Sequence, residues 1–343
     1  MSTVTPLDKV GEFGLIRRIQ QTVTLRQEST TLGIGDDAAI LTPAADHDLV
    51  ISTDLLVEGV HFDLTFAPLK HVGYKAVAVN VSDIAAMNAT PTQLVVAIAV
   101  GSRYSVEAIE ELYEGMRLAC EAYKVDLVGG DTTASRGGLT ISITALGQVP
   151  RGQAVRRSGA QSTDLLCVTG DLGGAFLGLQ VLEREKQAFL ADPDMQPELG
   201  NYSYVLQRQL RPEARMDVIH ELRELGVTPT SLIDISDGLA SETLHLCEAS
   251  GVGARIFTEN LPIANPTLEV ANEFNLDPIM CALNGGEDYE LLFTVPLADH
   301  DKLKRHPDIT IIGHMVPASE GANLITRAGQ PVPLQAQGWN HFN

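Results

Sequence analysis

The sequence predicts an α/β (α+β) protein of two domains, and three observations support this fold class. Apolar runs of strand length alternate with segments of helical periodicity in both halves of the chain. The length of 343 residues is roughly twice the ~150 residues of a typical domain. A stretch rich in Pro, Gly and Arg at residues 149–159 interrupts the alternation near the middle. We therefore predict an N-terminal domain of residues 1–150 and a C-terminal domain of residues 151–343.

The N-terminal half predicts strands with two long helices between them. Residues 105–123 carry apolar residues at the 3.6-residue period of an amphipathic helix, and Ser105 stands at its N-cap position. Residues 71–87 predict a second long helix, and residues 12–23 predict a shorter one near the start of the chain. The strands are predicted at residues 49–54, 92–100, 125–131 and 139–149.

The C-terminal half repeats this alternation of strands and helices. Pro212 is predicted in the first turn of a helix, where a residue without an N–H group is tolerated. The strands are predicted at residues 164–170, 231–235, 252–257 and 289–295. The helices are predicted at residues 174–190, 212–225, 237–250 and 266–274.

The composition excludes some partners and favours a compartment. A net charge of −20 argues against nucleic acids and anionic membranes, because binding to either needs a basic surface. Anionic phosphates could still bind if divalent cations lay between them and the acidic side chains. The four cysteines are widely spaced and no apolar run reaches signal-peptide or membrane-span length. We therefore expect reduced, buried thiols in a cytoplasmic protein.

Acidic residues recur beside Gly, Ser and Thr, near the ends of predicted strands. One such motif is ordinarily a turn, but six in one chain favour a shared site at the strand ends, where α/β folds bind ligands. Converging carboxylates repel by about 4 kcal/mol per pair at ~4 Å, and Mg²⁺, which prefers oxygen ligands, would relieve this repulsion. The motifs lie at residues 33–40, 52–54, 81–83, 129–133, 234–238 and 285–291.

Several familiar nucleotide and metal motifs are absent from the sequence. It contains no G-x-x-x-x-G-K-[ST] loop and no H-R-D or D-F-G set of a protein kinase. It also lacks H-E-x-x-H and the Cys/His spacings of zinc sites. If the protein binds nucleotides, it does so through the acidic motifs and not through any of these known motifs.

An ordered set of motifs runs through the chain: GEFGLI, GIGDDAAI, STDLLVEGVHF, YKAVAVNVSDIAAM, LVGGDTT, RRSGA, DISDGL, NGGEDYELLF and GWNHF. This set resembles the thiamine-monophosphate kinases, a family in the superfamily that includes aminoimidazole ribonucleotide synthetase. The set runs in the family's order from Gly11 to Phe342 and so covers essentially the whole chain. One departure is Asn88, where the family usually has Gly; Asn is the next-best residue for a left-handed helix end.

The resemblance implies an enzyme that moves the γ-phosphate of ATP directly onto thiamine monophosphate, giving thiamine diphosphate in thiamine diphosphate biosynthesis. It implies several Mg²⁺ ions and a homodimer whose N-terminal sheets join in a shared barrel. The N-terminal domain would bind ATP and Mg²⁺ and dimerise, and the C-terminal domain would complete the active site. Such a site needs no general base, because a phosphomonoester with a second pKa of about 6 is mostly dianionic at pH 7.

The resemblance also implies roles for residues at matching positions. Metal binding falls to Asp37, Thr53, Asp54, Asp83, Asp131, Asp234 and Asp237, with Ser52 nearby. ATP contacts fall to Gly130, Asp131, Arg157 and Ser236, and substrate contacts to His61, Glu287 and Trp339. Catalysis would rest on Asp54, Asp131 and Arg157, while Asp36 and Asp288 are expected in turns or supporting roles.

Two alternatives stay open from the sequence. The first is another ATP-dependent synthetase of the same superfamily. It is disfavoured because no Cys precedes Cys120 and the chain ends in His-Phe-Asn, without the reactive cysteines of selenophosphate synthetases and hydrogenase-maturation relatives. The second is a non-catalytic, metal-dependent nucleotide-binding regulator. An assay for thiamine diphosphate discriminates it from a kinase.

Overall fold

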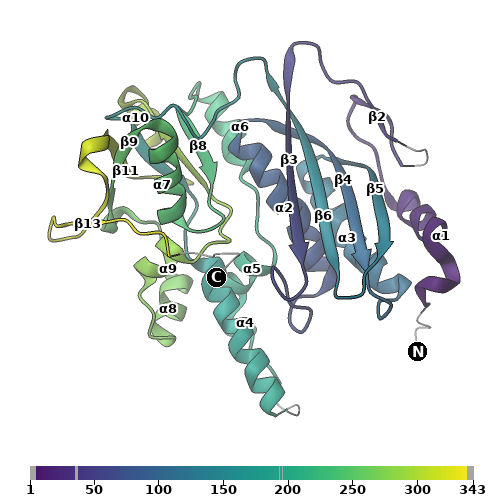
Figure 1. The fold of residues 1–343 in the computed structure, drawn as a ribbon. Coiled ribbons are helices and arrows are strands. Elements are labelled where there is room, and N and C mark those ends of the chain that lie inside the picture. Colours follow the sequence, from purple (N-terminus) through teal and green to yellow (C-terminus); the bar gives the residue numbers. More distant parts are fainter. Residues whose placement is uncertain (1–4, 35–37, 193, 195, 338–343) are drawn as a thin grey trace. The chain divides into compact units, whose positions relative to one another are not determined.

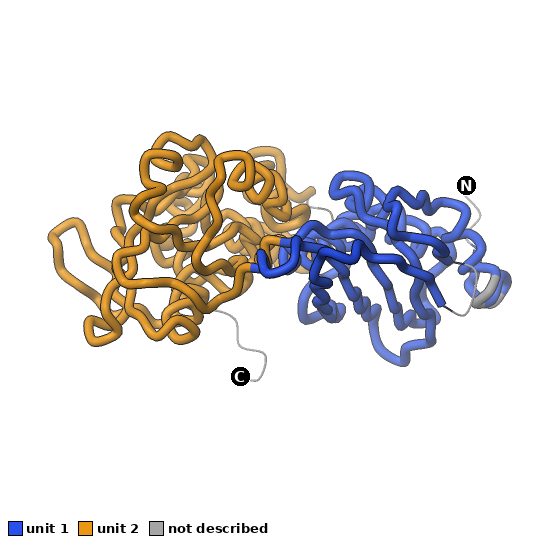
Figure 2. The backbone as a smooth tube through the Cα atoms, turned by 90° about the horizontal axis from the view of Figure 1, so that it is seen from above, with its two compact units in different colours: residues 1–84, 89–154 blue, residues 85–88, 155–343 orange. Residues whose placement is uncertain are grey.

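The computed structural model describes residues 5–34, 38–192, 194 and 196–337. The chain divides into two compact units, shown in Figure 2. Unit 1 comprises residues 1–84 and 89–154, and unit 2 comprises residues 85–88 and 155–343. No helix among the described residues combines the length and apolarity needed to cross a membrane.

Unit 1 is built on a four-stranded sheet of order β3-β6-β4-β5. Its strands are β3 (His47–Val57), β4 (Thr90–Val100), β5 (Asp126–Ala134) and β6 (Thr140–Pro150). The β3–β6 and β4–β6 pairs are antiparallel, whereas β4 and β5 are parallel and joined by α3 (Val106–Tyr123). Helix α2 (Leu69–Ala86) lies with α3 on one face of this sheet (Figure 1).

The two faces of the unit 1 sheet differ in burial because side chains alternate along a strand. On β6, Ile141 and Ile143 are fully buried on the face that carries the helices. On the opposite face, Leu49, Ile51 and Leu55 of β3 are 48%, 60% and 55% exposed. This second face is an uncovered apolar surface, which we call the outer face of the sheet.

A short N-terminal segment is tied to the edge strand β5. It contains α1 (Leu7–Thr22) and the antiparallel strands β1 (Thr30–Leu32) and β2 (Ile40–Leu41). The fully buried Asp126 accepts hydrogen bonds from the backbone N–H of Gln27 at 2.9 Å and from the hydroxyl of Thr30 at 2.7 Å. These bonds satisfy a buried carboxylate and fix the segment beside the sheet.

Unit 2 is built on a seven-stranded sheet of order β13-β12-β9-β11-β7-β10-β8. Every pair is antiparallel except β12 with β9. The strands are β7 (Leu165–Thr169), β8 (Ser231–Asp234), β9 (Val252–Phe257), β10 (Leu291–Val295), β11 (Ile309–Pro317), β12 (Ala322–Ile325) and β13 (Pro331–Pro333).

Helices connect and cover these strands. Helix α7 (Leu239–Ser250) packs on the sheet through Leu239 and Leu246, which join Leu166, Ile233 and Ile256 of the strands in one buried cluster. The α-helices are α4 (Gly174–Ala191), α5 (Ser203–Leu210), α6 (Met216–Glu224), α7 (Leu239–Ser250), α8 (Asn265–Glu273), α9 (Pro278–Asn284) and α10 (His300–Leu303). The 3₁₀ turns are η1 (Gly200–Tyr202), η2 (Thr258–Asn260), η3 (Leu297–Asp299) and η4 (Ala318–Glu320).

The α/β (α+β) class is confirmed, and so are two local predictions. The Ser105 hydroxyl accepts a hydrogen bond from the Ala108 N–H at 3.2 Å, as an N-cap does. Asn88 takes the left-handed conformation, with φ 56°. The prediction for Pro212 is wrong: α6 begins at Met216, because the preceding segment carries the Arg215 guanidinium to the buried Glu290. All four cysteines are buried and free, as expected.

Candidate active site

In unit 1, the structure brings Ser52, Asp54 and Asp83 together between β3 and α2. Ser52 and Asp54 point to the same face of β3 because they are two residues apart. The Ser52 hydroxyl donates a hydrogen bond to Asp83 Oδ2 on α2. Burial, and secondarily the negative charge of Asp83, raise the pKa of Asp54 to about 6. The partly buried Asp54 carboxylate and the neighbouring charge of Asp83 therefore form a place where a cation would be stabilised.

Two other predicted residues of unit 1 lie near β3. The Thr53 side chain points to the outer face, where its hydroxyl donates to the Ile143 carbonyl at 3.0 Å, so it does not join Asp54. His61 follows β3, and its Nδ1 accepts a hydrogen bond from the Val57 N–H at 3.0 Å. In a neutral imidazole the proton then resides on Nε2, which makes that atom a donor.

Gly130 and Asp131 lie on β5, at the other edge of the sheet from β3. A Cβ atom at Gly130 would stand 1.9 Å from the Val96 carbonyl oxygen, so only glycine allows this strand pairing. Asp131 is exposed and pairs in register with Ala97, on the outer face. Three strand spacings of about 4.8 Å separate β5 from β3, roughly 14 Å in all. Unit 1 alone therefore does not bring Asp131 to Asp54.

The expectation that the acidic residues stand at strand ends is wrong for two of them. Asp54 and Asp131 lie inside their strands, because pairing with β6 extends β3 to Val57 and pairing with β4 extends β5 to Ala134. It holds for Asp234, which is the last residue of β8.

In unit 2, two motifs far apart in sequence pack against each other. The Glu287 N–H donates to the Ser236 carbonyl at 2.7 Å, and the Tyr289 N–H donates to the Ile235 carbonyl at 2.9 Å. Asp234 and Asp237 flank these contacts, at the end of β8 and just before α7. The structure thus brings Asp234, Ser236, Asp237 and Glu287 to one place.

Glu287 is held in a conformation that non-glycine residues seldom adopt, with φ 62°. Its carboxylate accepts hydrogen bonds from the Tyr289 hydroxyl at 3.0 Å and from Gln209 Nε2 at 3.3 Å. A left-handed conformation of this kind costs free energy, and it persists where contacts with the surrounding structure hold it, as at ligand sites. The geometry fixes where the Glu287 carboxylate points.

Buried ion pairs stabilise the loop that carries Glu287. Glu290 Oε1 contacts Arg208 Nη1 at 2.8 Å, and Glu290 Oε2 contacts Arg215 Nη1 at 2.7 Å and the Thr169 hydroxyl at 2.5 Å. Asp288 accepts the Gly173 N–H at 2.8 Å beside the start of α4, and burial raises its pKa to about 7. Nothing in the spacing of Arg208 and Arg215 had indicated this network.

Gly238 sets the path of the turn between Asp237 and α7. Its φ is 123°, and a Cβ atom would lie 2.7 Å from the Leu283 carbonyl oxygen. We expect Gly238→Ala to lower the free energy of unfolding by about 3 kcal/mol or more, from strain and overpacking. Gly226→Ala is the control, because Gly226 also has a positive φ, 61°, but nothing within 4 Å; it should cost about 1 kcal/mol. Chemical unfolding measures both, and equal losses would contradict the steric argument.

The remaining predicted residues are placed as follows. Arg157 is exposed, and its carbonyl accepts a hydrogen bond from the Ser250 hydroxyl at 3.2 Å. Asp36, Asp37 and Trp339 lie outside the described residues. The sequence reasoning missed Glu242, which is buried in the first turns of α7 beside Asp237.

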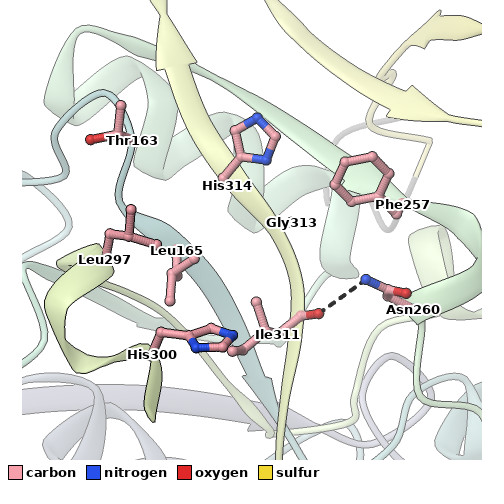
Figure 3. A pocket seen from close by; sticks show the side chains of 9 residues that line it. All are labelled: Thr163, Leu165, Phe257, Asn260, Leu297, His300, Ile311, Gly313 and His314. Carbon is pink, nitrogen blue, oxygen red and sulfur yellow. Dashed lines mark hydrogen bonds between the residues drawn. The ribbon is translucent and has the colours of Figure 1, made fainter. Parts of the chain in front are cut away.

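A groove of about 460 Å³ opens elsewhere on unit 2 (Figure 3). Phe257, His300, Ile311 and His314 are among its lining residues, and Asn260 Nδ2 donates to the Ile311 carbonyl at 3.3 Å. None of the predicted site residues that the structure describes lines it. Although a large pocket is the usual first candidate for a site, the acidic motifs place the chemistry elsewhere.

Comparison with known proteins first gives the class. The family described as AIR synthase related protein, N-terminal domain, matches residues 35–149, which span most of the unit 1 sheet. This match makes residues 35–149 an N-terminal domain of the AIR synthase related class.

Full-length relatives then give the family. Thiamine-monophosphate kinase of Bacillus subtilis (strain 168) is 35% identical over 338 residues, which cover 97% of this chain and 100% of the relative. The crystal structure of thiamine-monophosphate kinase from Stenotrophomonas maltophilia K279a has a TM-score of 0.79 at 35% identity, covering 94% of this chain and 98% of that one. The structure of AaThiL complexed with AMPPCP and TMP has a TM-score of 0.75 at 34% identity, covering 99% and 100%. The chain belongs to the thiamine-monophosphate kinase family.

Proposed function

We propose that the protein transfers the γ-phosphate of ATP to thiamine monophosphate and so makes thiamine diphosphate. The observation that carries the proposal is similarity over the full length to proteins of that name, one of them solved with AMPPCP and TMP. The acidic motifs supply carboxylate oxygens, and such oxygens can bind the divalent cations that neutralise phosphate charge in a reaction of this kind.

The residues fit Mg²⁺ as the metal. Asp54 and Asp83 are close enough for each to disfavour the other's charge, and Ser52 adds a hydroxyl oxygen beside them. Hard oxygen donors of this kind suit Mg²⁺. Asp37, Thr53, Asp131, Asp234 and Asp237 complete the proposed metal-binding set. When bound, Mg²⁺ would neutralise the phosphate groups and hold their oxygens in place.

The chain's own residues would then bind and orient the two substrates. A phosphate oxygen of thiamine monophosphate attacks the γ-phosphorus directly, and the dianion needs no base to activate it. We assign Gly130, Asp131, Arg157 and Ser236 to ATP, and His61, Glu287 and Trp339 to thiamine monophosphate. The transfer proceeds in line and without a phosphorylated enzyme; isolating a phospho-aspartate during turnover would contradict it.

The domain roles follow from this assignment. Residues 1–150 bind ATP and Mg²⁺ and dimerise, and residues 151–343 complete the active site. Four buried, free cysteines fit a reducing compartment, and we place the protein in the cytoplasm.

We infer a homodimer formed through the outer face of the unit 1 sheet. Exposed apolar residues on that face, Ile51 at 60% among them, are typical of an interface. Ile51→Lys is expected to convert the dimer to a monomer in sedimentation velocity. Leu190→Lys is the control, because Leu190 is equally exposed, at 61%, but lies on α4 of unit 2. A wild-type monomer, or dissociation by both variants, would contradict the assignment.

The activity test is direct. The full chain is incubated with ATP, Mg²⁺ and thiamine monophosphate, and thiamine diphosphate and ADP are separated and quantified. Equimolar formation of both products is expected, and none should form after EDTA treatment. A protein that binds both ligands without forming thiamine diphosphate would instead be the non-catalytic regulator.

A further inference from the structure

Glu242 occupies an unusual place in unit 2. It lies near the start of α7 and is only 2% exposed. Its Oε1 accepts a hydrogen bond from the backbone N–H of Asp237 at 3.1 Å. The side chain therefore reaches back across the start of the helix and holds the turn that carries Asp237.

The second carboxylate oxygen of Glu242 is unpaired. Oε2 is buried and has no hydrogen-bond partner among the described residues. Glu242 also lies close enough to Asp237 and Asp234 to interact with the charge of each. Three acidic groups thus gather where β8 ends and α7 begins. A buried, unpaired carboxylate oxygen beside two aspartates is costly to the fold.

Support of the turn does not explain a glutamate at this position. A glutamine side-chain oxygen could accept the same N–H bond from Asp237, and its amide would bring no third acidic group to Asp234 and Asp237. A glutamate at this position is therefore less favourable for the metal-free fold than a glutamine would be. A carboxylate oxygen that has no protein partner, in a residue that interacts with two aspartates, gains a hydrogen-bond partner when a hydrated divalent cation is bound there.

We propose that Glu242 is a positioning residue for a divalent cation held by Asp234 and Asp237. It acts in two ways: Oε1 fixes the turn that presents Asp237, and Oε2 accepts a hydrogen bond from a water molecule of the bound cation. This inference rests on the proposed metal dependence of the function, but it concerns cation binding and not phosphoryl transfer.

The test measures cation binding without turnover. Mn²⁺ is titrated into the full-length, EDTA-treated protein and followed by electron paramagnetic resonance, with and without AMPPCP and without thiamine monophosphate. Glu242→Gln is expected to weaken Mn²⁺ binding about tenfold, as loss of a second-sphere partner typically does. Asp237→Asn is expected to weaken Mn²⁺ binding at the same site. Glu248→Gln, an exposed residue of the same helix with the same change of charge, should bind Mn²⁺ as the wild type does.

The stability of the same variants separates a cation role from a purely structural one. Metal-free Glu242→Gln is expected to be at least as stable to heat as the wild type, and to gain less stability from Mn²⁺. Unchanged Mn²⁺ affinity in a folded Glu242→Gln protein overturns the proposal, as does a wild type that binds no Mn²⁺ even with AMPPCP. If Glu242→Gln fails to fold, Glu242→Asp is titrated under the same criterion. A wild type that makes no thiamine diphosphate but shows the Glu242 effect refutes the proposed function and leaves this inference intact.

Discussion

Asp54→Asn is expected to lower kcat by about a thousandfold, the scale of losing a group that stabilises charge directly in the reaction. Asparagine keeps the shape of Asp54 but removes the charge that the buried site holds beside Asp83. Asp131→Asn should have a similar effect. Asp48→Asn is the control, because Asp48 lies on the same strand and accepts the Gly152 N–H at 2.9 Å, away from the proposed site. Near-normal rates of thiamine diphosphate formation in both active-site variants would reject the metal assignment.

The same Asp54 substitution should stabilise the metal-free protein, in a pH-dependent manner. The folded-state pKa of Asp54 is raised from 3.8 to about 6, so the folded state binds this proton more tightly than the unfolded state does. Stability is therefore lost as the pH rises from about 4 to 6, by up to ~3 kcal/mol for a shift of about two units. Thermal unfolding in EDTA should show Asp54→Asn and the wild type alike at pH 4 and the variant more stable at pH 7. A wild type that is equally stable at both pH values would contradict the pKa shift.

Glu290→Ala is expected to destabilise unit 2 by about 3–5 kcal/mol, the usual loss when a buried ion pair is broken from one side. The Glu290 side chain is 1% exposed and lies between two guanidinium groups that are 17% and 11% exposed. Removing it leaves Arg208 with Asp288, at 3.8 Å, and Arg215 with Asp217, at 3.0 Å, so both guanidinium groups lose their shared buried partner. The loop that carries Glu287 would lose its support, so thiamine monophosphate should also bind more weakly.

A matched variant shows whether the destabilisation comes from the burial of the ion pair or from the loss of any ion pair. Glu273 contacts Arg184 at 2.6 Å, but the two side chains are 46% and 36% exposed. Because exposed pairs contribute about 1 kcal/mol or less, Glu273→Ala should have little effect on the unfolding temperature. Similar shifts in the two variants would show that the Glu290 network is not the special support inferred from its burial.

The helices and strands that were predicted best have a strong apolar periodicity, and their limits depend little on the elements that pack against them. Helix α3 and strand β6 were found within a residue or two, because one apolar stripe or a strict alternation determines each. Strand β11 was missed because Gly313 and His314 interrupt its apolar run. Strands β12 and β13 were missed because they are short and their residues are only partly buried or exposed. The sheet orders depend on pairing between distant strands and could not be read from local patterns.

The candidate site was predicted in its residue types but not in its arrangement. The acidic motifs were visible because Asp beside Gly and Ser recurs along the chain. Whether Asp54 and Asp131 share a face depends on strand register, which the motifs do not encode. Glu242 and Glu290 were not singled out, although Glu290 lies in the acidic motif at residues 285–291, because nothing in the sequence reports their burial.

The reaction rates of the four buried thiols can be used to measure local opening of the protein. Burial raises the pKa of Cys120 and Cys167, and a thiol must become both exposed and ionised before it reacts quickly. Cys120 lies in unit 1, whereas Cys167, Cys247 and Cys281 lie in unit 2. The rate at which a thiol reagent labels each cysteine therefore reports how often its own unit opens. Peptide mapping of labelled protein would let one sample follow the two units separately.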